Sequence, residues 1–198
     1  MPGLLVTLVV LGLGGLAAFR IAAGDAGPDP AKWLLHQTGF WALVFLVATL
    51  AVSTLRRLLR RPTLALWRRP VGLAAFAIAT SHLLVYLTVF HGLDVAAILD
   101  DVTKRLYIMI GFAAWLLLLP MAFTSTRTAR RRLGDRWVAI HRAIYLIVPL
   151  GVLHQGMAQK ADLGQTLVFS ALVACFLIER RLAAKGLLPW ARRGAKLS

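Results

Sequence analysis

The chain has 198 residues, of which 59% are hydrophobic and only 16% are charged. A soluble domain of this size needs more polar surface, so the composition excludes an ordinary soluble enzyme. The net charge of +15 would suggest a nucleic-acid partner in a soluble protein. No basic module with interleaved aromatic residues accompanies that charge, so we expect no nucleic-acid binding.

Six apolar segments follow one another along the chain, and most approach the ~20 residues that cross the core of a bilayer. The first lies near residues 4–23, where a signal peptide is the alternative, although no Lys or Arg precedes the apolar stretch. The others lie near residues 38–55, 71–90, 106–123, 141–158 and 163–182. We therefore predict an all-α integral membrane protein, in which a six-helix transmembrane bundle forms a single domain over residues 1–198.

Basic residues are concentrated in every second connection and in the tail. They lie at residues 56–69, 127–136 and 180–196, whereas most acidic residues lie in the other connections: Asp25, Asp29, Asp94, Asp100, Asp101 and Asp162. Basic loops stay on the cytoplasmic side, so both termini should be cytoplasmic in a multi-pass protein of the bacterial inner membrane. We interpret the arginine clusters as determinants of topology that also contact anionic membrane lipid.

Two of the five histidines fall inside predicted spans, His82 in the third and His154 in the fifth. At 1.5 Å per residue they lie roughly 16 and 20 Å into their segments, both in the periplasmic half of the bilayer. Ionisable groups inside a bilayer are costly and usually functional, and neutral imidazole is a heme iron ligand. We predict one heme with His82 and His154 as axial ligands. The alternative is that these histidines bind no cofactor and are packed inside the bundle, hydrogen-bonded to neighbouring hydroxyl groups such as those of Ser81 or Thr80.

The remaining residues limit the kind of cofactor. With the single cysteine Cys175, no Cys-x-x-Cys-His attachment can form, so the heme should be a non-covalent heme b. Zinc would need further Cys, Asp or Glu ligands, and none lies at the depth of the two histidines. A second heme would need another histidine in the third segment at the depth of His141. The residue that precedes His82 by the same number of positions as His141 precedes His154 is Arg69. One heme is therefore favoured over two.

A long run joins the fourth and fifth segments. It reads Ala122-Phe-Thr-Ser-Thr-Arg-Thr-Ala-Arg-Arg-Arg-Leu-Gly-Asp-Arg-Trp137, followed by Ile140-His-Arg-Ala-Ile-Tyr145 and His154. Shorter motifs are Asp29-Pro30, His36-Gln-Thr-Gly-Phe-Trp-Ala-Leu43, Arg68-Arg69 with Gly72, Ser81-His82 and Thr103-Lys-Arg-Leu-Tyr107. Over roughly residues 25–160, the chain resembles the heme-binding membrane subunits of periplasmic methionine sulfoxide reductase systems, the MsrQ or YedZ family of ferric-reductase-like transmembrane proteins.

The resemblance implies heme b and flavin mononucleotide (FMN) as cofactors. It implies transfer of electrons from the quinol pool, or from a cytoplasmic flavin reductase, to a periplasmic molybdopterin-dependent methionine sulfoxide reductase subunit. That partner restores methionine in damaged envelope proteins. The chain shows no nucleophile–base pair and no phosphate-binding glycine loop, so we expect no catalytic residues in it and assign catalysis to the partner.

Three further residues are candidates for cofactor binding. His36 lies at the periplasmic end of the second span, where it either approaches the heme edge or is solvated. His141 and Arg142 lie at the cytoplasmic end of the fifth span, where they suit a flavin phosphate or a quinone headgroup. The alternative for His141 is an interfacial side chain capped by water or lipid phosphate. A heme-free membrane anchor or a small transporter is the alternative function, but neither accounts for His82 together with His154.

Overall fold

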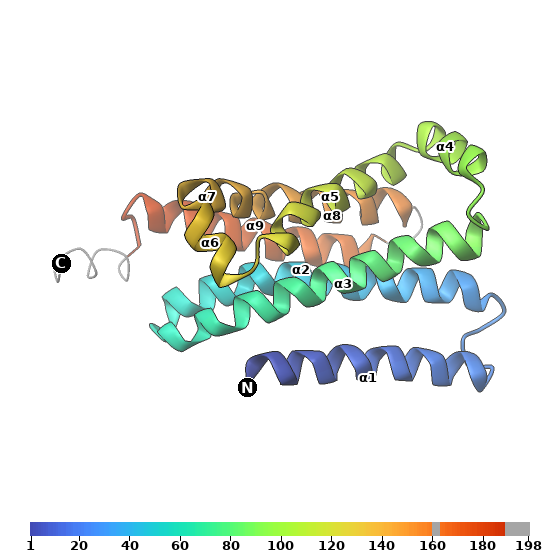
Figure 1. Ribbon diagram of the computed structural model, residues 1–198, viewed down its shortest axis with the longest axis horizontal. Coiled ribbons are helices and arrows are strands. Elements are labelled where there is room, and N and C mark those ends of the chain that lie inside the picture. The colour runs from blue at the N-terminus through green and yellow to red at the C-terminus, as the bar shows by residue number, and fades with distance from the viewer. Residues whose placement is uncertain (160–162, 189–198) are drawn as a thin grey trace.

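The computed structural model describes residues 1–159 and 163–188, and every regular element in these ranges is a helix (Figure 1). The elements are α1 (Pro2–Ala22), α2 (Pro30–Leu58), the short 3-10 helix η1 (Pro62–Trp67), α3 (Arg68–Val85), the π-helical turn η2 (Tyr86–Phe90), α4 (Val95–Lys104), α5 (Leu106–Phe123), α6 (Arg127–Leu133), α7 (Asp135–Arg142), α8 (Ile144–Ala158) and α9 (Gly164–Ala184). Lys160 and Asp162 of the predicted fifth connection, and the tail residues Arg192, Arg193 and Lys196, lie outside the described residues.

Within the described ranges, five stretches of helix are long and apolar enough to cross a membrane. They are Pro2–Ala22, Pro30–Leu58, Pro62–Phe90, Leu106–Phe123 and Asp135–Ala158. The prediction of an all-helical, multi-pass membrane protein is thereby confirmed. Helix α9 is not among the five, because Glu179, Arg180 and Arg181 lie in its last turns. It nevertheless packs along α2 and α8 (Figure 1).

The helices begin where the sequence supplies caps. Asp29 accepts a hydrogen bond from the backbone N–H of Lys32 at 2.9 Å, and Pro30 occupies the first position of α2. Helix α2 therefore begins at Pro30, before the start of the predicted segment 38–55. Asp94 caps α4 in the same way through the backbone N–H groups of Ala96 and Ala97. Both caps lie in the connections at one end of the bundle (Figure 1).

Two helix pairs form the centre of the bundle. Helix α2 packs along α3 and α5 packs along α8, and the two pairs meet in one apolar core. Ala75, Ile147 and Val148 are completely buried there. Helix α1 lies at the edge of this core and contributes only Val6 as a buried residue, so most of its apolar surface is left to lipid.

The predicted fifth span lies within the stretch Asp135–Ala158, which has an irregularity at Ala143. Helix α7 ends at Arg142, Ala143 separates it from α8, and α8 begins at Ile144. The sequence predicts His141 and His154 on a single helix. In the structure His141 belongs to α7, which together with α6 forms a separate feature at one end of the bundle (Figure 1). The irregularity separates His141 on α7 from His154 on α8.

Candidate functional site

His82 projects from α3 toward α2. Its Nδ1 lies 3.0 Å from the carbonyl oxygen of Leu35 and 3.3 Å from the hydroxyl of Thr38. A carbonyl oxygen only accepts hydrogen bonds, so the proton of a neutral imidazole sits on Nδ1. The lone pair of His82 is then on Nε2, and that nitrogen is available to a metal ion.

His154 is held in the same way by the other helix pair. It projects from α8, and its Nδ1 lies 2.6 Å from the carbonyl oxygen of Tyr107 on α5. The Tyr107 ring also lies beside the imidazole, with 5.9 Å between the ring centroids. By the same reasoning, Nε2 of His154 carries its lone pair.

Two glycines make room for these imidazoles. His82 follows Leu35 by 47 residues, and His154 follows Tyr107 by the same number. A glycine lies four positions after each carbonyl residue, Gly39 after Leu35 and Gly111 after Tyr107. A Cβ at Gly39 would lie 3.0 Å from Cε1 of His82. A Cβ at Gly111 would lie 2.7 Å from Nδ1 of His154, closer than real Cβ atoms approach. The helices can therefore bring the carbonyl and the imidazole together only because no side chain stands between them.

The two imidazoles lie next to each other in an edge-type arrangement. Their ring centroids are 6.2 Å apart and their planes make an angle of 80°. An iron held by two imidazole nitrogens at about 2 Å, each about 1 Å from its ring centre, separates the ring centroids by about 6 Å. The described residues hold no group of three or more His, Cys, Asp or Glu side chains able to bind a metal. The geometry therefore fits a cofactor with two axial histidines, such as heme, and does not fit a tetrahedral zinc site.

The other predicted site residues lie apart from this pair. His36 follows Leu35 on α2, but its side chain is exposed and makes no hydrogen bond or ring contact with a described residue. Arg142 is likewise exposed and makes no such contact within the described ranges. The structure thus brings His82 and His154 together and leaves His36 and Arg142 at the surface.

His141 belongs to an aromatic and cationic stack at the end of α5 and α7. Its ring stacks on Trp137 with centroids 4.0 Å apart, and the Arg130 guanidinium lies 5.1 Å from the Trp137 ring centroid. Nε2 of His141 lies 3.2 Å from the Thr124 hydroxyl, and Trp137 donates from Nε1 to the Thr124 carbonyl at 2.9 Å. This stack could hold a flat, anionic group beside a polar imidazole.

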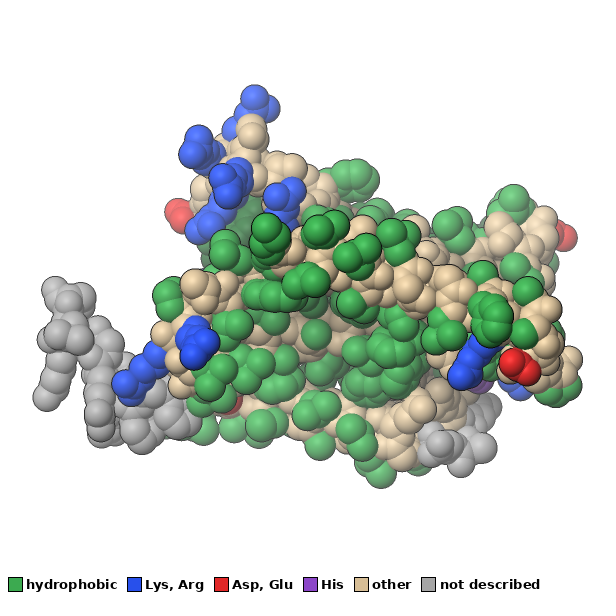
Figure 2. Space-filling model, turned by 90° about the horizontal axis from the view of Figure 1, so that it is seen from below, with side chains coloured by type: hydrophobic (Ala, Val, Ile, Leu, Met, Phe, Trp, Pro, Cys, Tyr) green, Lys and Arg blue, Asp and Glu red, His purple; other side chains and the backbone are tan. Residues whose placement is uncertain are grey.

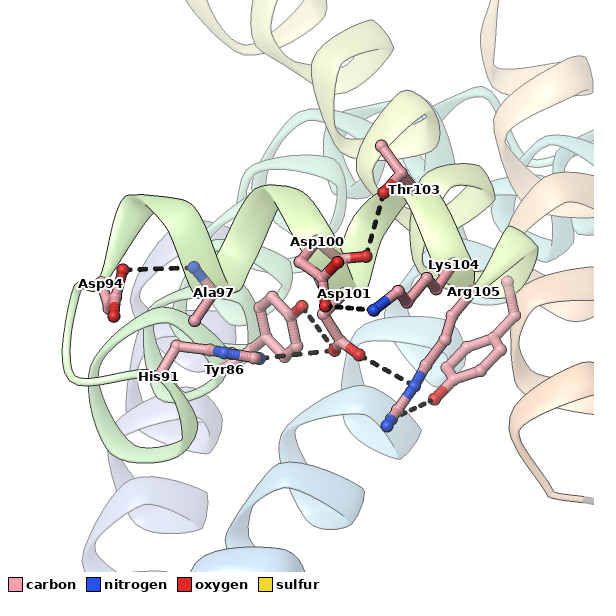
Figure 3. Close-up of polar contacts among 10 residues, drawn as sticks. Tyr86, His91, Asp94, Ala97, Asp100, Asp101, Thr103, Lys104 and Arg105 are labelled. Carbon is pink, nitrogen blue, oxygen red and sulfur yellow. Dashed lines mark hydrogen bonds and ion pairs between the residues drawn. The ribbon is translucent and has the colours of Figure 1, made fainter.

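Sequence reasoning did not single out a second polar cluster, which is centred on Asp101 of α4 (Figure 3). The Asp101 carboxylate accepts from the Tyr86 hydroxyl at 2.9 Å and pairs with Nε of Arg105 at 2.8 Å. Nε2 of His91 lies 3.4 Å from the same carboxylate. Asp101 thus ties the surface helix α4 to η2 and to the start of α5.

The Asp101 cluster continues toward His154 through Arg105 and Tyr107. Arg105 donates to the Tyr107 hydroxyl at 3.3 Å, and the carbonyl of Tyr107 holds the imidazole of His154. The hydrogen bond to Tyr107 and the nearby Asp101 charge raise the pKa of Arg105, which therefore stays charged. Tyr86 and Asp101 are 15 positions apart, whereas Tyr107 and His154 are 47 positions apart. The motif Thr103-Lys-Arg-Leu-Tyr107 contains two of the residues involved, Arg105 and Tyr107. The cluster thus reaches the side chain of the residue whose carbonyl holds His154.

Comparison with known proteins shows which family the chain is similar to. Residues 33–152 match the family described as ferric reductase like transmembrane component. Two relatives, from Rhodospirillum rubrum and Bordetella pertussis, are each named protein-methionine-sulfoxide reductase heme-binding subunit MsrQ. The first is 44% identical over 172 residues, covering 83% of this chain and 80% of that protein. The second is 41% identical over 180 residues, covering 89% and 85%.

The chain belongs to the MsrQ family. A relative of the same name from Agrobacterium fabrum is 43% identical over 162 residues, covering 81% of this chain and 75% of that protein. No solved structure matches the chain. The ferric-reductase-like range includes Gly39, His82 and Gly111, and ends two residues before His154. Membership of the MsrQ family confirms the predicted family and indicates a membrane electron-transfer role.

Proposed function

We propose that this chain is a heme b electron-transfer subunit. It takes electrons from the quinol pool or from a cytoplasmic flavin reductase and passes them to a periplasmic molybdopterin-dependent reductase, which repairs methionine sulfoxide in envelope proteins. The adjacent pair of His82 and His154, 6.2 Å apart between ring centroids, is the observation that carries the proposal. The names of the MsrQ relatives, which describe heme-binding subunits of a methionine sulfoxide reductase, support it.

The residues around the two histidines have defined tasks in this function. The carbonyls of Leu35 and Tyr107 fix the tautomer and the ring orientation of His82 and His154, as outer partners of metal-bound histidines do. Bound between them, the heme would supply one-electron chemistry, and the apolar helices would keep it away from water. The two carbonyls belong to separate helix pairs, so the packing of these pairs sets the distance between the ligands.

The distribution of charge supports a six-span topology with both termini in the cytoplasm. Lys and Arg side chains gather at the end of the bundle that carries α6 and α7, whereas α4 and the α1–α2 connection lie at the opposite end (Figures 1 and 2). Basic segments remain cytoplasmic, so α4 would face the periplasm. The Asp101 cluster would then lie where electrons leave toward the periplasmic partner, close to His154.

The stack of Arg130, Trp137 and His141 is our candidate for the electron entry from the cytoplasm. Its aromatic rings suit the flat isoalloxazine ring of FMN, and the neighbouring exposed Arg142 suits the phosphate. A direct ligand role for His141 would require a second histidine beside it, whereas its imidazole contacts Thr124 and Trp137. We therefore propose that His141 assists reduction of the heme without binding its iron.

Optical spectroscopy of the purified protein tests the proposal. The wild type should show a Soret band, and acid–acetone should extract the heme because no covalent attachment exists. His82→Ala and His154→Ala should each abolish or severely shift the spectrum. His36→Ala and His141→Ala serve as controls that keep the heme, and His141→Ala should slow reduction by a cytoplasmic donor while dithionite reduction stays unchanged. Full heme retention in both ligand variants would contradict the assignment.

A further inference from the structure

Tyr107 contacts His154 with two different parts of its structure. Its backbone carbonyl oxygen lies 2.6 Å from Nδ1 of the imidazole. Its side-chain ring lies beside the imidazole, with the centroids 5.9 Å apart and an angle of 40° between the two planes. One hydrogen bond at Nδ1 fixes the place of that nitrogen but lets the imidazole plane turn about the bond, and a ring packed beside the imidazole opposes that turn. The side chain of Tyr107 can therefore determine the plane of His154.

His82 is oriented by a different set of groups. The residue that precedes it by 47 positions, as Tyr107 precedes His154, is Leu35. Nδ1 of His82 lies near two oxygens, the Leu35 carbonyl at 3.0 Å and the Thr38 hydroxyl at 3.3 Å. The two halves of the site thus share a carbonyl and a glycine. They differ in the third contact, which is a hydroxyl for His82 and an aromatic ring for His154.

The far end of the Tyr107 ring is held by a charged network. Its hydroxyl accepts from Nη1 of Arg105 at 3.3 Å, and Nε of the same guanidinium pairs with the Asp101 carboxylate at 2.8 Å. The Asp101 side chain is only 15% exposed and also accepts from the Tyr86 hydroxyl at 2.9 Å (Figure 3). A planar guanidinium with two partners is fixed in its orientation. The network, which is anchored in α4 and η2, therefore limits the movement of the Tyr107 ring.

The plane of His154 matters because it is crossed with the plane of His82. The two imidazole planes make an angle of 80°. An imidazole bound to iron interacts most strongly with the iron d orbital that lies perpendicular to its own plane. Crossed imidazoles therefore act on two different d orbitals, whereas parallel imidazoles act on the same one. The angle between the planes thus affects the electronic state and the reduction potential of an iron that both histidines bind.

We propose that Tyr107 is a positioning residue, whose ring, held by Arg105 and Asp101, keeps the plane of His154 crossed with that of His82. The inference rests on the proposed function, because it assumes a heme between the two histidines. The alternative is that the pair of Asp101 and Arg105 only ties α4 to the start of α5. That tie does not involve the Tyr107 ring, so substitutions of Tyr107 alone distinguish the two roles.

Tyr107→Phe and Tyr107→Leu separate the hydroxyl from the ring. Both variants keep the carbonyl that holds His154, and Tyr107→Leu supplies the side chain that Leu35 has in the other half of the site. The ferric full chain with its heme, in detergent, is measured by electron paramagnetic resonance, which reports the angle between the imidazole planes. The wild type should show the single large-g signal of crossed imidazoles. Tyr107→Leu should show three resolved g values instead, and Tyr107→Phe a mixture of both signals.

Binding of carbon monoxide provides a second measurement. Carbon monoxide binds to ferrous heme only after one histidine has left the iron, so its binding rate reports how firmly the ligands are held. We expect the rate to rise about tenfold in Tyr107→Leu, the size of effect that outer partners of metal ligands have, and less in Tyr107→Phe. Lys104→Gln, which breaks the exposed pair with Asp100, is the matched control and should keep the wild-type signal and rate.

The outcomes separate this inference from the proposed function. An unchanged signal and rate in Tyr107→Leu, at full heme content, would overturn the positioning role and leave the heme ligands in place. A wild-type signal of parallel imidazoles would overturn it as well. If Tyr107→Leu binds no heme, Tyr107→Phe decides, and either a wild-type signal or a loss of heme in that variant would overturn the inference. Absence of heme from the wild type would refute the proposed function itself.

Discussion

Gly39 and Gly111 show how single residues decide the site. Glycine inside a helix costs roughly 0.5–1 kcal/mol relative to alanine, so its presence needs a reason. The reason here is the imidazole that occupies the space of the missing side chain. The sequence shows the same local pattern at both positions, because a Gly-Phe pair occurs at Gly39 and again at Gly111. The two glycines stand in the same relation to their histidines.

Replacing these glycines should disturb the histidines without unfolding the helices. In Gly111→Ala, the new Cβ would lie 2.7 Å from the His154 ring, which must move, so we expect loss of most of the bound heme or a clear shift of its spectrum. Gly39→Ala, with its closest approach at 3.0 Å, should have a smaller effect of the same kind. The measurement is the heme-to-protein ratio and the Soret position of purified protein.

Gly12→Ala is the control for both substitutions, because no atom lies within 4 Å of a Cβ at that position. Alanine favours the helix, so this variant should keep its heme and be at least as stable as the wild type. An unaltered spectrum in Gly111→Ala would show that the imidazole of His154 does not rest on this glycine.

At the scale of elements, α9 is the helix whose sequence is hardest to interpret. Its apolar run is followed by three charged residues, which shortens the segment that hydropathy alone can recognise. The structure shows what hydropathy cannot, namely that Glu179 binds Arg57 and the hydroxyl of Thr54 on α2. The next residue, Arg180, lies over the Tyr145 ring of α8 with its guanidinium 4.1 Å from the ring centroid. These contacts explain how a helix with charged ends packs against the bundle.

Removing the charge of Glu179 should loosen α9 from α2. Its side chain is 11% exposed and that of Arg57 is 22% exposed, so solvent screens this pair only in part. Hydrogen bonds to charged groups are worth about 1.5–3 kcal/mol, and an unpaired partner adds a cost of its own. We expect Glu179→Gln to lower the free energy of unfolding by about 1–3 kcal/mol, measured by denaturation in detergent.

The exposed pair of Asp100 and Lys104 provides the matched control. Both of its side chains are more than half exposed, so Asp100→Asn should change stability by less than about 0.5 kcal/mol. The double variant of Arg57→Gln with Glu179→Gln should recover part of the stability lost in Glu179→Gln, because it leaves no unpaired charge. Equal stability of Glu179→Gln and wild type would show that the ion pair does not hold α9.

For the whole molecule, hydropathy was sufficient to predict an all-helical, multi-pass membrane protein, and the motifs were sufficient to predict its family. Helix α5 occupies the same residues, 106–123, as the predicted segment. The irregularity at Ala143 and the surface helix α4 were not predicted: hydropathy does not reveal a local change within an apolar segment, and α4 is marked only by its Asp94 cap. The six-span count, the orientation and the two heme ligands stay predictions. Their strongest support is the convergence of two helix pairs on adjacent imidazoles.

The bundle as a whole should carry electrons without reducing methionine sulfoxide itself. The pair of His82 and His154 can hold an electron cofactor, but neither this site nor the His141 stack presents a nucleophile with a base or a centre that could accept the sulfoxide oxygen. Detergent-purified protein that is reduced chemically should therefore not convert methionine sulfoxide to methionine. Adding the periplasmic molybdopterin partner should start turnover and reoxidise the heme, measured together by product analysis and by the Soret band. Turnover by the reduced chain alone would place a substrate-reducing centre inside the bundle and refute its assignment as an electron-transfer subunit.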